Sequence, residues 1–160
     1  MIRSTQSNVK DFPERLCISI GGFFGPCYEL TFKKGRLTYT YLSSRDSCSR
    51  EPELRQLLGL KPLPQPEEIQ PSAKQWRAFR RTLDRLNVWC WQRNYLDPHV
   101  CDGTGWSAEI VYSDRELVSS GGNCFPGRDG RALPLTGDER DNTFERFSRA
   151  VARLAGRKFH

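Results

Sequence analysis

Apolar and polar residues alternate along two stretches in the first half of the chain, residues 27–32 and 37–42, which flank Lys34 and Gly35. Alternation with a period of two is typical of strands that bury one face, and a glycine at the tip supplies the positive φ that a tight turn needs. We therefore predict a hairpin with Phe32 opposite Leu37. Its apolar face would consist of Tyr28, Leu30, Phe32, Leu37, Tyr39 and Tyr41.

The second half of the chain shows a similar pattern in residues 106–112 and 116–121, on either side of Asp114-Arg115. Continuing the alternation outward from this turn places Trp106 opposite Asn123. Shorter runs predict two further strands, at residues 16–20 and 88–91.

Two other stretches repeat apolar residues at the spacing of one helix face. They predict helices over residues 72–86, with Ser72 as the N-cap, and over residues 138–155, with Asp138 as the N-cap. The apolar stripes are Trp76, Phe79, Leu83 and Leu86 in the first helix and Phe144, Phe147, Val151 and Leu154 in the second. A proline-rich linker of about residues 50–71 precedes the first helix. Within it, residues 53–60 fit a short helix and residues 61–66 predict an extended segment.

The two halves of the chain, about residues 15–86 and 87–156, each show the order strand, hairpin, helix, which indicates a pseudo-repeat. Together these elements predict a single α+β domain spanning residues 1–160. Its core would be a single antiparallel sheet of about six strands with the two helices packed on one face.

Composition narrows the class of protein. The 160 residues carry a net charge of +6, and no apolar run approaches the roughly 20 residues of a membrane helix. The first residues are polar and lack the apolar core of a signal peptide, so we expect a cytoplasmic protein without membrane association. In the cytoplasm the six cysteines should be reduced thiols. Because they include no C-x-x-C pair, we expect neither a metal site nor a cofactor.

Two glycine-rich loops, residues 102–106 and 121–126, are predicted to meet at one end of the sheet and to form a small ligand pocket. The candidate residues are Asp102, Thr104, Trp106 and Asn123, together with Trp89, Trp91 and Tyr95 from the neighbouring segment. The alternative is a network that only stabilises the turns, with Asp102 accepting backbone N–H groups, Asn123 in a left-handed bend and the tryptophans in the core. We favour this second interpretation.

Catalytic patterns are weak. The only close histidine–cysteine pair is His99 and Cys101. Glu29 and Glu109 occupy equivalent positions of the two hairpins, where carboxylates on a solvated sheet face are the ordinary explanation. We therefore assign no catalytic residue.

One face of the first predicted helix is basic, and its cations are Lys74, Arg77, Arg81 and Arg85. Such a face is a candidate nucleic-acid site. However, stacking surfaces interleave aromatic residues with cations, and here the hairpin aromatics are predicted to be buried. A solvated basic surface is the simpler interpretation.

Residues 24–28, Phe-Gly-Pro-Cys-Tyr, followed by residues 35–39, Gly-Arg-Leu-Thr-Tyr, resemble the opening hairpin of an uncharacterised bacterial domain family. Members of that family show a Phe-Gly-x-Cys segment before a Tyr-bearing strand, usually with Pro where Tyr28 stands. The segments at residues 102–106 and 123–126 are similar to a recurring pattern in bacterial proteins of unknown function. The resemblance covers only part of the chain and implies a fold and a bacterial origin, but no activity.

These observations favour a small non-enzymatic binding or protein-interaction module of a bacterial cytoplasm, with an unidentified protein or small molecule as its partner. The first alternative is a small enzyme with its site at the Asp102, Trp106 and Asn123 end of the sheet. The second alternative is a nucleic-acid binder that uses the basic first helix.

Overall fold

The computed structural model describes residues 11–22, 25–44, 46, 50–97, 99, 103–134 and 142–160. Its main element is a seven-stranded sheet with the strand order β4-β3-β2-β1-β6-β7-β5. The strands of this sheet are β1 (Arg15–Gly22), β2 (Cys27–Lys33), β3 (Arg36–Leu42), β4 (Glu67–Ile69), β5 (Asn94–Leu96), β6 (Thr104–Val111) and β7 (Glu116–Gly122). A separate two-stranded sheet pairs β8 (Cys124–Pro126) with β9 (Ala132–Pro134). The helices are α1 (Pro52–Leu57), α2 (Ala73–Leu86) and α3 (Thr143–Ala155), with a short 3₁₀ helix η1 (Val88–Cys90) after α2.

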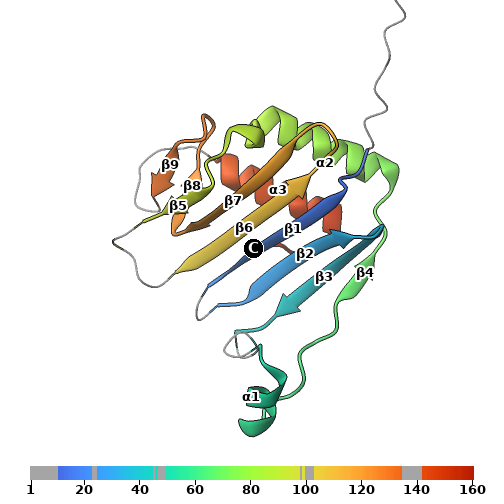
Figure 1. Ribbon diagram of the computed structural model, residues 1–160, viewed down its shortest axis with the longest axis vertical. Helices are drawn as coiled ribbons and strands as arrows, with labels where there is room; N and C mark the ends of the chain where they lie inside the picture. Colours follow the sequence, from blue (N-terminus) through green and yellow to red (C-terminus); the bar gives the residue numbers. More distant parts are fainter. Residues whose placement is uncertain are drawn as a thin grey trace, which may run out of the picture.

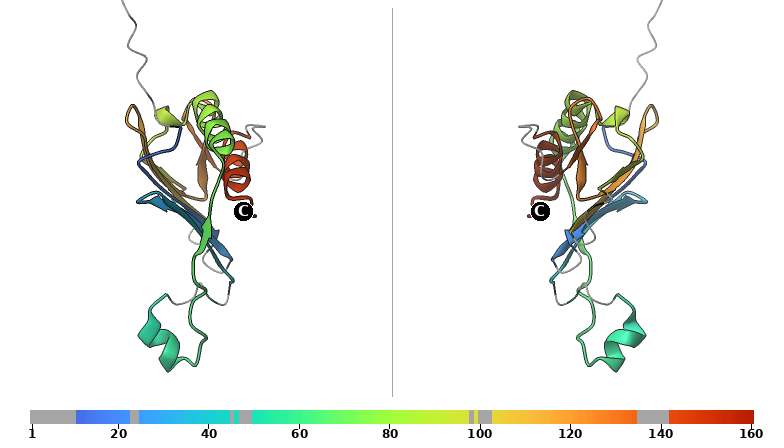
Figure 2. Two further views of the ribbon diagram at one scale, coloured as in Figure 1. Left: turned by 90° about the vertical axis from the view of Figure 1, so that its right-hand side faces the viewer. Right: turned by 90° about the vertical axis from the view of Figure 1, so that its left-hand side faces the viewer.

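Helices α2 and α3 lie next to each other on one face of the large sheet, behind it in Figure 1 and to one side of it in Figure 2. The α+β class is therefore confirmed. The predicted sheet of about six antiparallel strands is wrong in detail, because the sheet has seven strands and β5 runs parallel to β7. The central pair β1 and β6 joins the two halves of the chain in one sheet.

The first hairpin has the predicted register, with Phe32 opposite Leu37, Leu30 opposite Tyr39 and Tyr28 opposite Tyr41. The two-residue turn at Lys34 and Gly35 sets this register, and both residues adopt a positive φ. Of the six predicted core residues, five are buried, but Tyr41 is 46% exposed. Tyr41 lies near the end of β3, where neither α2 nor α3 covers the sheet, and its ring packs on Tyr28 instead.

The second hairpin differs from the prediction by two residues. Trp106 lies opposite Gly121, not Asn123, and Ile110 lies opposite Leu117. The cause is the longer turn, in which the N–H of Tyr112 donates to the carbonyl of Arg115 at 2.8 Å and so closes a four-residue connection. A shift of two residues keeps every side chain on the predicted face, because side chains alternate along a strand.

The predicted strand at residues 88–91 is also wrong. Asn87 ends α2 in the left-handed conformation, with a φ of 51°, and the chain turns at once into η1. The edge of the sheet is formed instead by β5, a few residues later. An apolar run of four residues is too short to distinguish a strand from a tight helical turn.

The predicted helices are present, and their apolar stripes face the sheet. The N-cap Ser72 forms a capping box in which the N–H of Gln75 donates to Ser72 Oγ at 3.3 Å and the N–H of Ser72 donates to Gln75 Oε1 at 2.9 Å. Helix α3 begins at Thr143 and ends before Gly156, which is left-handed, whereas the predicted start at residue 138 lies outside the described residues.

The proline-rich stretch of residues 50–71 has the short helix that we predicted there and a strand that we did not. It contains α1 and strand β4, which pairs antiparallel with β3 and places Ile69 opposite Leu37. The pseudo-repeat stays a prediction. Both halves contain a hairpin followed by a helix, but β1 pairs antiparallel with its own hairpin whereas β5 pairs parallel with β7.

Candidate functional site

At the end of the sheet where we predicted that the two glycine-rich loops meet, the side chain of Asn123 bonds to the neighbouring backbone. Asn123 is 5% exposed and left-handed, with a φ of 53°. Its Oδ1 accepts the N–H of Thr104 at 2.9 Å, and its own N–H donates to the Thr104 carbonyl at 3.0 Å. A Cβ atom on Gly103 would lie 1.7 Å from this Oδ1, so only glycine fits there. Asp102, the remaining polar candidate, lies outside the described residues.

The aromatic candidates Trp91, Tyr95 and Trp106 are core residues, each at most 7% exposed. The rings of Trp91 and Tyr95 have centroids 6.0 and 5.8 Å from that of Trp106, and Phe144 of α3 packs against Trp106 at 4.8 Å. Trp106 Nε1 donates to the Cys124 carbonyl at 2.9 Å. Most of the polar groups at this end of the sheet thus stabilise the protein's own turns, which is the arrangement that the turn-network interpretation describes.

The Tyr95 hydroxyl also forms its hydrogen bonds with the protein's own backbone. It accepts the N–H of Gln92 at 2.8 Å and donates to the carbonyl of Gly130 at 2.7 Å, and its burial raises the pKa of Tyr95. The hydroxyl therefore joins the η1–β5 segment to the loop before β9. A phenol whose two hydrogen-bonding roles are both filled by backbone has none left for a ligand.

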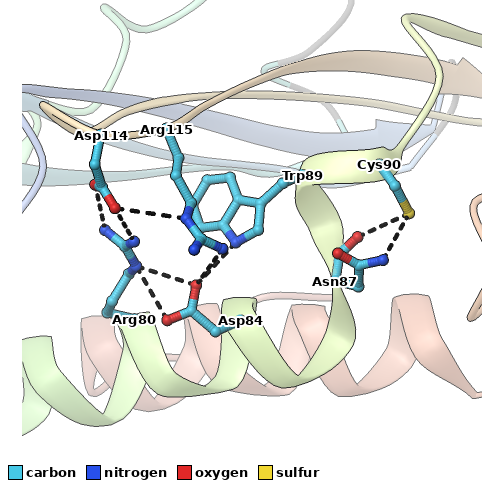
Figure 3. A network of polar contacts seen from close by, with 7 residues as sticks. All are labelled: Arg80, Asp84, Asn87, Trp89, Cys90, Asp114 and Arg115. Carbon is cyan, nitrogen blue, oxygen red and sulfur yellow. Dashed lines mark hydrogen bonds and ion pairs between the residues drawn. The ribbon is translucent and has the colours of Figure 1, made fainter.

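Trp89 lies apart from the other aromatic candidates, in a group of side chains that we call the Arg80 cluster. Its members are Arg80, Asp84, Trp89, Asp114 and Arg115, which Figure 3 shows, together with Tyr112. The Arg80 guanidinium makes two hydrogen bonds to Asp114, at 3.0 and 2.7 Å, and lies 4.4 Å from the centre of the Tyr112 ring. Trp89 Nε1 donates to Asp84 Oδ1 at 2.8 Å.

The Arg80 cluster connects α2 to the turn between β6 and β7, and its charges balance. The guanidinium of Arg80 holds the pKa of Asp114 below its ordinary value, chiefly by hydrogen bonding. In return, the hydrogen bonds from Arg80 to Asp114 raise the pKa of Arg80. Two arginines and two aspartates satisfy one another here, so the cluster is a structural connection and has no unpaired charge to offer a ligand.

Among the catalytic candidates that the structure describes, Glu29 and Glu109 are not brought together. His99 is exposed, and its backbone N–H donates to Asp97 Oδ1 at 3.0 Å, while Cys101 lies outside the described residues. Glu29 and Glu109 lie on β2 and β6, which are separated by β1, and each forms an ion pair with an arginine. Arg15 is the partner of Glu109.

The basic face of α2 divides into two parts. Arg77 turns toward Asp11, with which it pairs at 3.0 Å. Lys74, Arg81 and Arg85 instead line a groove of about 960 Å³ between α2 and α3. The other lining residues of this α2–α3 groove are Gln75, Ala78, Phe79, Thr82 and Asp84 from α2 and Ala150, Arg153 and Leu154 from α3.

The α2–α3 groove combines a positive rim with a largely apolar floor. Its floor includes Ala150 and Leu154, which are 3% and 2% exposed. Its rim carries four exposed cations, Lys74, Arg81, Arg85 and Arg153. None of the four forms an ion pair with another described residue, although nine arginines elsewhere in the described part of the chain do.

Asp84, the one acid among the lining residues, is already bonded to Arg80 and Trp89. The groove is therefore a positively charged surface with little internal compensation. Arg153 was not predicted as a site residue, although it follows Arg149 and Arg146 at the i+4 and i+7 spacing of one helix face. That spacing is a signal for a second basic helix face, but it does not show that the two basic faces meet.

A smaller hollow of about 350 Å³ lies on the sheet face away from the helices. Its lining residues are Cys17, Arg93, Asn94, Ser107, Ala108, Glu109, Val118, Ser119 and Ser120. Ser107 bonds to Ser19 at 2.8 Å, and Glu109 pairs with Arg15. Within the described ranges, no group of three or more His, Cys, Asp or Glu side chains is placed to hold a metal ion.

Comparison of the chain with protein-family models, with curated proteins and with solved structures returned no match. The resemblance of the first hairpin to an uncharacterised bacterial family therefore stays an expectation. None of the helices in the described part of the chain has both the length and the apolar character needed to cross a bilayer. The geometry of the α2–α3 groove is thus the basis for a functional proposal.

Proposed function

We propose that this protein is a non-enzymatic interaction module whose α2–α3 groove binds an acidic, amphipathic helical segment of a partner protein. The observation that carries the proposal is the set of four cations, Lys74, Arg81, Arg85 and Arg153, which surround the groove without ion pairs among the described residues. Unpaired like charges around a low-dielectric floor attract carboxylates and raise the rate of encounter with an acidic partner.

The floor of the groove favours a peptide. Ala78 of α2, which is exposed, and Ala150 of α3, which is 3% exposed, both line the groove, and small side chains allow another backbone to approach closely. An amphipathic helix laid in such a groove buries its apolar stripe and places its acidic flanks against the cations.

Nucleic acid fits the groove less well. Phe79 is the only aromatic residue among the lining residues, and it is 2% exposed, so it offers no ring on which a base stacks. The enzyme alternative has weaker support, because Asn123 and Trp106 at the sheet end bond to backbone. Binding of nucleic-acid phosphates by the rim cations is the competing function, and a binding titration distinguishes it from peptide binding.

The test is a binding titration by fluorescence anisotropy. The probe is a labelled helical peptide with leucines at i, i+3 and i+4 and glutamates between them, and a peptide with glutamine in place of glutamate is its control. We expect the acidic peptide to bind with an affinity that falls as salt rises, because the contacts are ionic. The glutamine peptide should bind at least tenfold more weakly.

Two charge-reversal variants locate the site. One variant is Arg81→Glu on α2 and the other is Arg153→Glu on α3. Each should weaken acidic-peptide binding at least tenfold, because each reverses a charge at the rim of the groove. Arg36→Glu, at the tip of the first hairpin, changes the net charge equally and should leave binding unchanged. Equal loss in all three variants would show that only net charge matters and would refute the groove. Tighter binding of a DNA or RNA oligonucleotide, lost in the same two variants, would replace the peptide with nucleic acid.

A further inference from the structure

Helix α1 displays an apolar face that nothing in the described part of the chain covers. Leu54, Leu57 and Leu58 are 40%, 81% and 58% exposed. Their spacing of i, i+3 and i+4 places all three on one side of this helical turn. In Figures 1 and 2, α1 lies well away from the large sheet and from α2 and α3.

Hydrogen bonds of a buried side chain hold this exposed turn in place. Arg55, on the same turn, is 3% exposed. Its guanidinium donates to the Lys61 carbonyl at 2.6 and 2.8 Å and to Asp46, at 3.0 Å to the carbonyl and 3.0 Å to the carboxylate. A hydrogen bond from the Ser43 hydroxyl is the main cause that lowers the pKa of Asp46. The buried arginine therefore closes the loop at its base, while the leucines stay outside.

The apolar stripe of α1 is flanked by carboxylates. Glu51 and Glu53 are exposed and form no ion pair with any residue that the structure describes. Glu53 precedes Leu57 by four positions, so the two side chains are neighbours on the helix surface. Helix α1 thus has the chemistry that the α2–α3 groove requires of a ligand, namely leucines beside unpaired carboxylates.

We propose that α1 of one copy of this protein docks in the α2–α3 groove of a second copy. The inference rests on the proposed function, because it names one occupant of the same groove. The leucines would cover the apolar floor, and Glu51 and Glu53 would face rim cations such as Arg81. Within one copy the two surfaces lie at opposite ends of the molecule, so α1 does not reach its own groove (Figure 1).

Docking of this kind joins two different surfaces and is therefore head-to-tail. After the first contact the pair of copies still has one free α1 and one free groove, so assembly continues to longer chains or to closed rings. Pairing of α1 with α1 is the competing arrangement. It would bring the carboxylates of two copies together without cations, and it would stop at a dimer.

Sedimentation velocity over a wide concentration range tests the proposal. The wild-type protein should shift from monomer to species larger than a dimer as its concentration rises. The paired changes Leu57→Ser and Leu58→Ser in α1, and the paired changes Arg81→Glu and Arg153→Glu in the groove, should each lower the association constant at least tenfold. Leu96→Ser, which removes a leucine that is 73% exposed at the sheet edge, is the matched control and should assemble as the wild type does.

The decisive experiment mixes the two paired variants, one changed in α1 and the other changed in the groove. The α1 variant retains its groove and the groove variant retains its α1, so an equimolar mixture should form one-to-one dimers and nothing larger. A wild-type protein that stays monomeric at every concentration overturns the proposal. Assembly by the groove variant alone overturns it too, because α1 would then pair with α1.

The outcome for the proposed function is read separately. If the wild-type protein binds the acidic peptide but stays monomeric, the groove is a docking site for another protein and only the self-docking inference fails. If it neither binds the peptide nor assembles, both proposals fail. Circular dichroism and the melting temperature of each variant show whether a loss of assembly reflects a loss of folding.

Discussion

Replacing Asn123 with alanine tests whether the loop end of the sheet is a turn network or a pocket. In the structure, Asn123 Oδ1 accepts the N–H of Thr104 at 2.9 Å, at the first residue of β6. Alanine leaves that partly buried donor without its partner, at a cost of about 1–2 kcal/mol. Alanine also tolerates the left-handed φ of 53° less well than asparagine, at a further cost of about 1 kcal/mol. The expected total is about 2–3 kcal/mol.

Urea unfolding, followed by tryptophan fluorescence and by circular dichroism, measures this loss. Asn123→Gly is the matched control, since glycine removes the same hydrogen bond without the backbone strain. It should be about 1 kcal/mol more stable than Asn123→Ala. In a chain of 160 residues, 1 kcal/mol corresponds to a change of roughly 2–4 °C in melting temperature. An Asn123→Ala protein with wild-type stability would refute the turn network and make this end of the sheet a candidate binding site.

Three further predictions concern the core, the Arg80 cluster and the cysteines. Phe79→Ala should lower the free energy of unfolding by about 3–5 kcal/mol, because the ring is 2% exposed and leaves a cavity, and an unchanged urea midpoint would contradict this. Hydrogen bonding to Arg80 lowers the pKa of Asp114 in the folded protein. The contact therefore stabilises the fold fully at pH values above the ordinary carboxyl pKa of about 3.9. This stabilisation is lost as the pH falls through the lower pKa that Asp114 has in the folded state. Asp114→Asn should therefore reduce stability at neutral pH and flatten its decline in acid, and an unchanged acid-unfolding curve would refute the linkage. Thiol titration of protein denatured without air should find six thiols, since the four cysteines that the structure describes are free, whereas two or fewer would show a disulfide framework.

Local patterns in the sequence were sufficient for much of the fold. The first hairpin has the predicted register because a two-residue turn with Gly35 leaves few ways to pair the flanking strands. The capping box at Ser72 marks the start of α2 because its hydrogen bonds join residues three positions apart. Both features depend on residues that are close together in the sequence, so they can be predicted without knowing the rest of the molecule.

The errors occurred where local patterns leave more than one solution. Alternation specifies which face a side chain occupies but not the length of a turn, so the register of the second hairpin differed by two residues without moving Ile110 to the wrong face. The short apolar run after α2 fits both a strand and a 3₁₀ helix, and the left-handed Asn87 decides for the latter. Strand β4 was missed because only three of its residues pair, and their partners on β3 lie far back along the chain.

The candidate groove depended most on tertiary structure. Arg77, Arg80 and Arg81 are almost adjacent in the sequence and look equivalent there. Arg77 pairs with Asp11 and Arg80 with Asp114, carboxylates that are distant along the chain, so Arg81 alone of the three turns toward the groove without an ion pair among the described residues. The sequence determined that α2 has one apolar and one basic face. Only the tertiary structure decided which cations remain unpaired, because ion pairs form by distance in space and not by spacing along the chain. The packing of α2 against α3 decided where the unpaired cations meet Arg153.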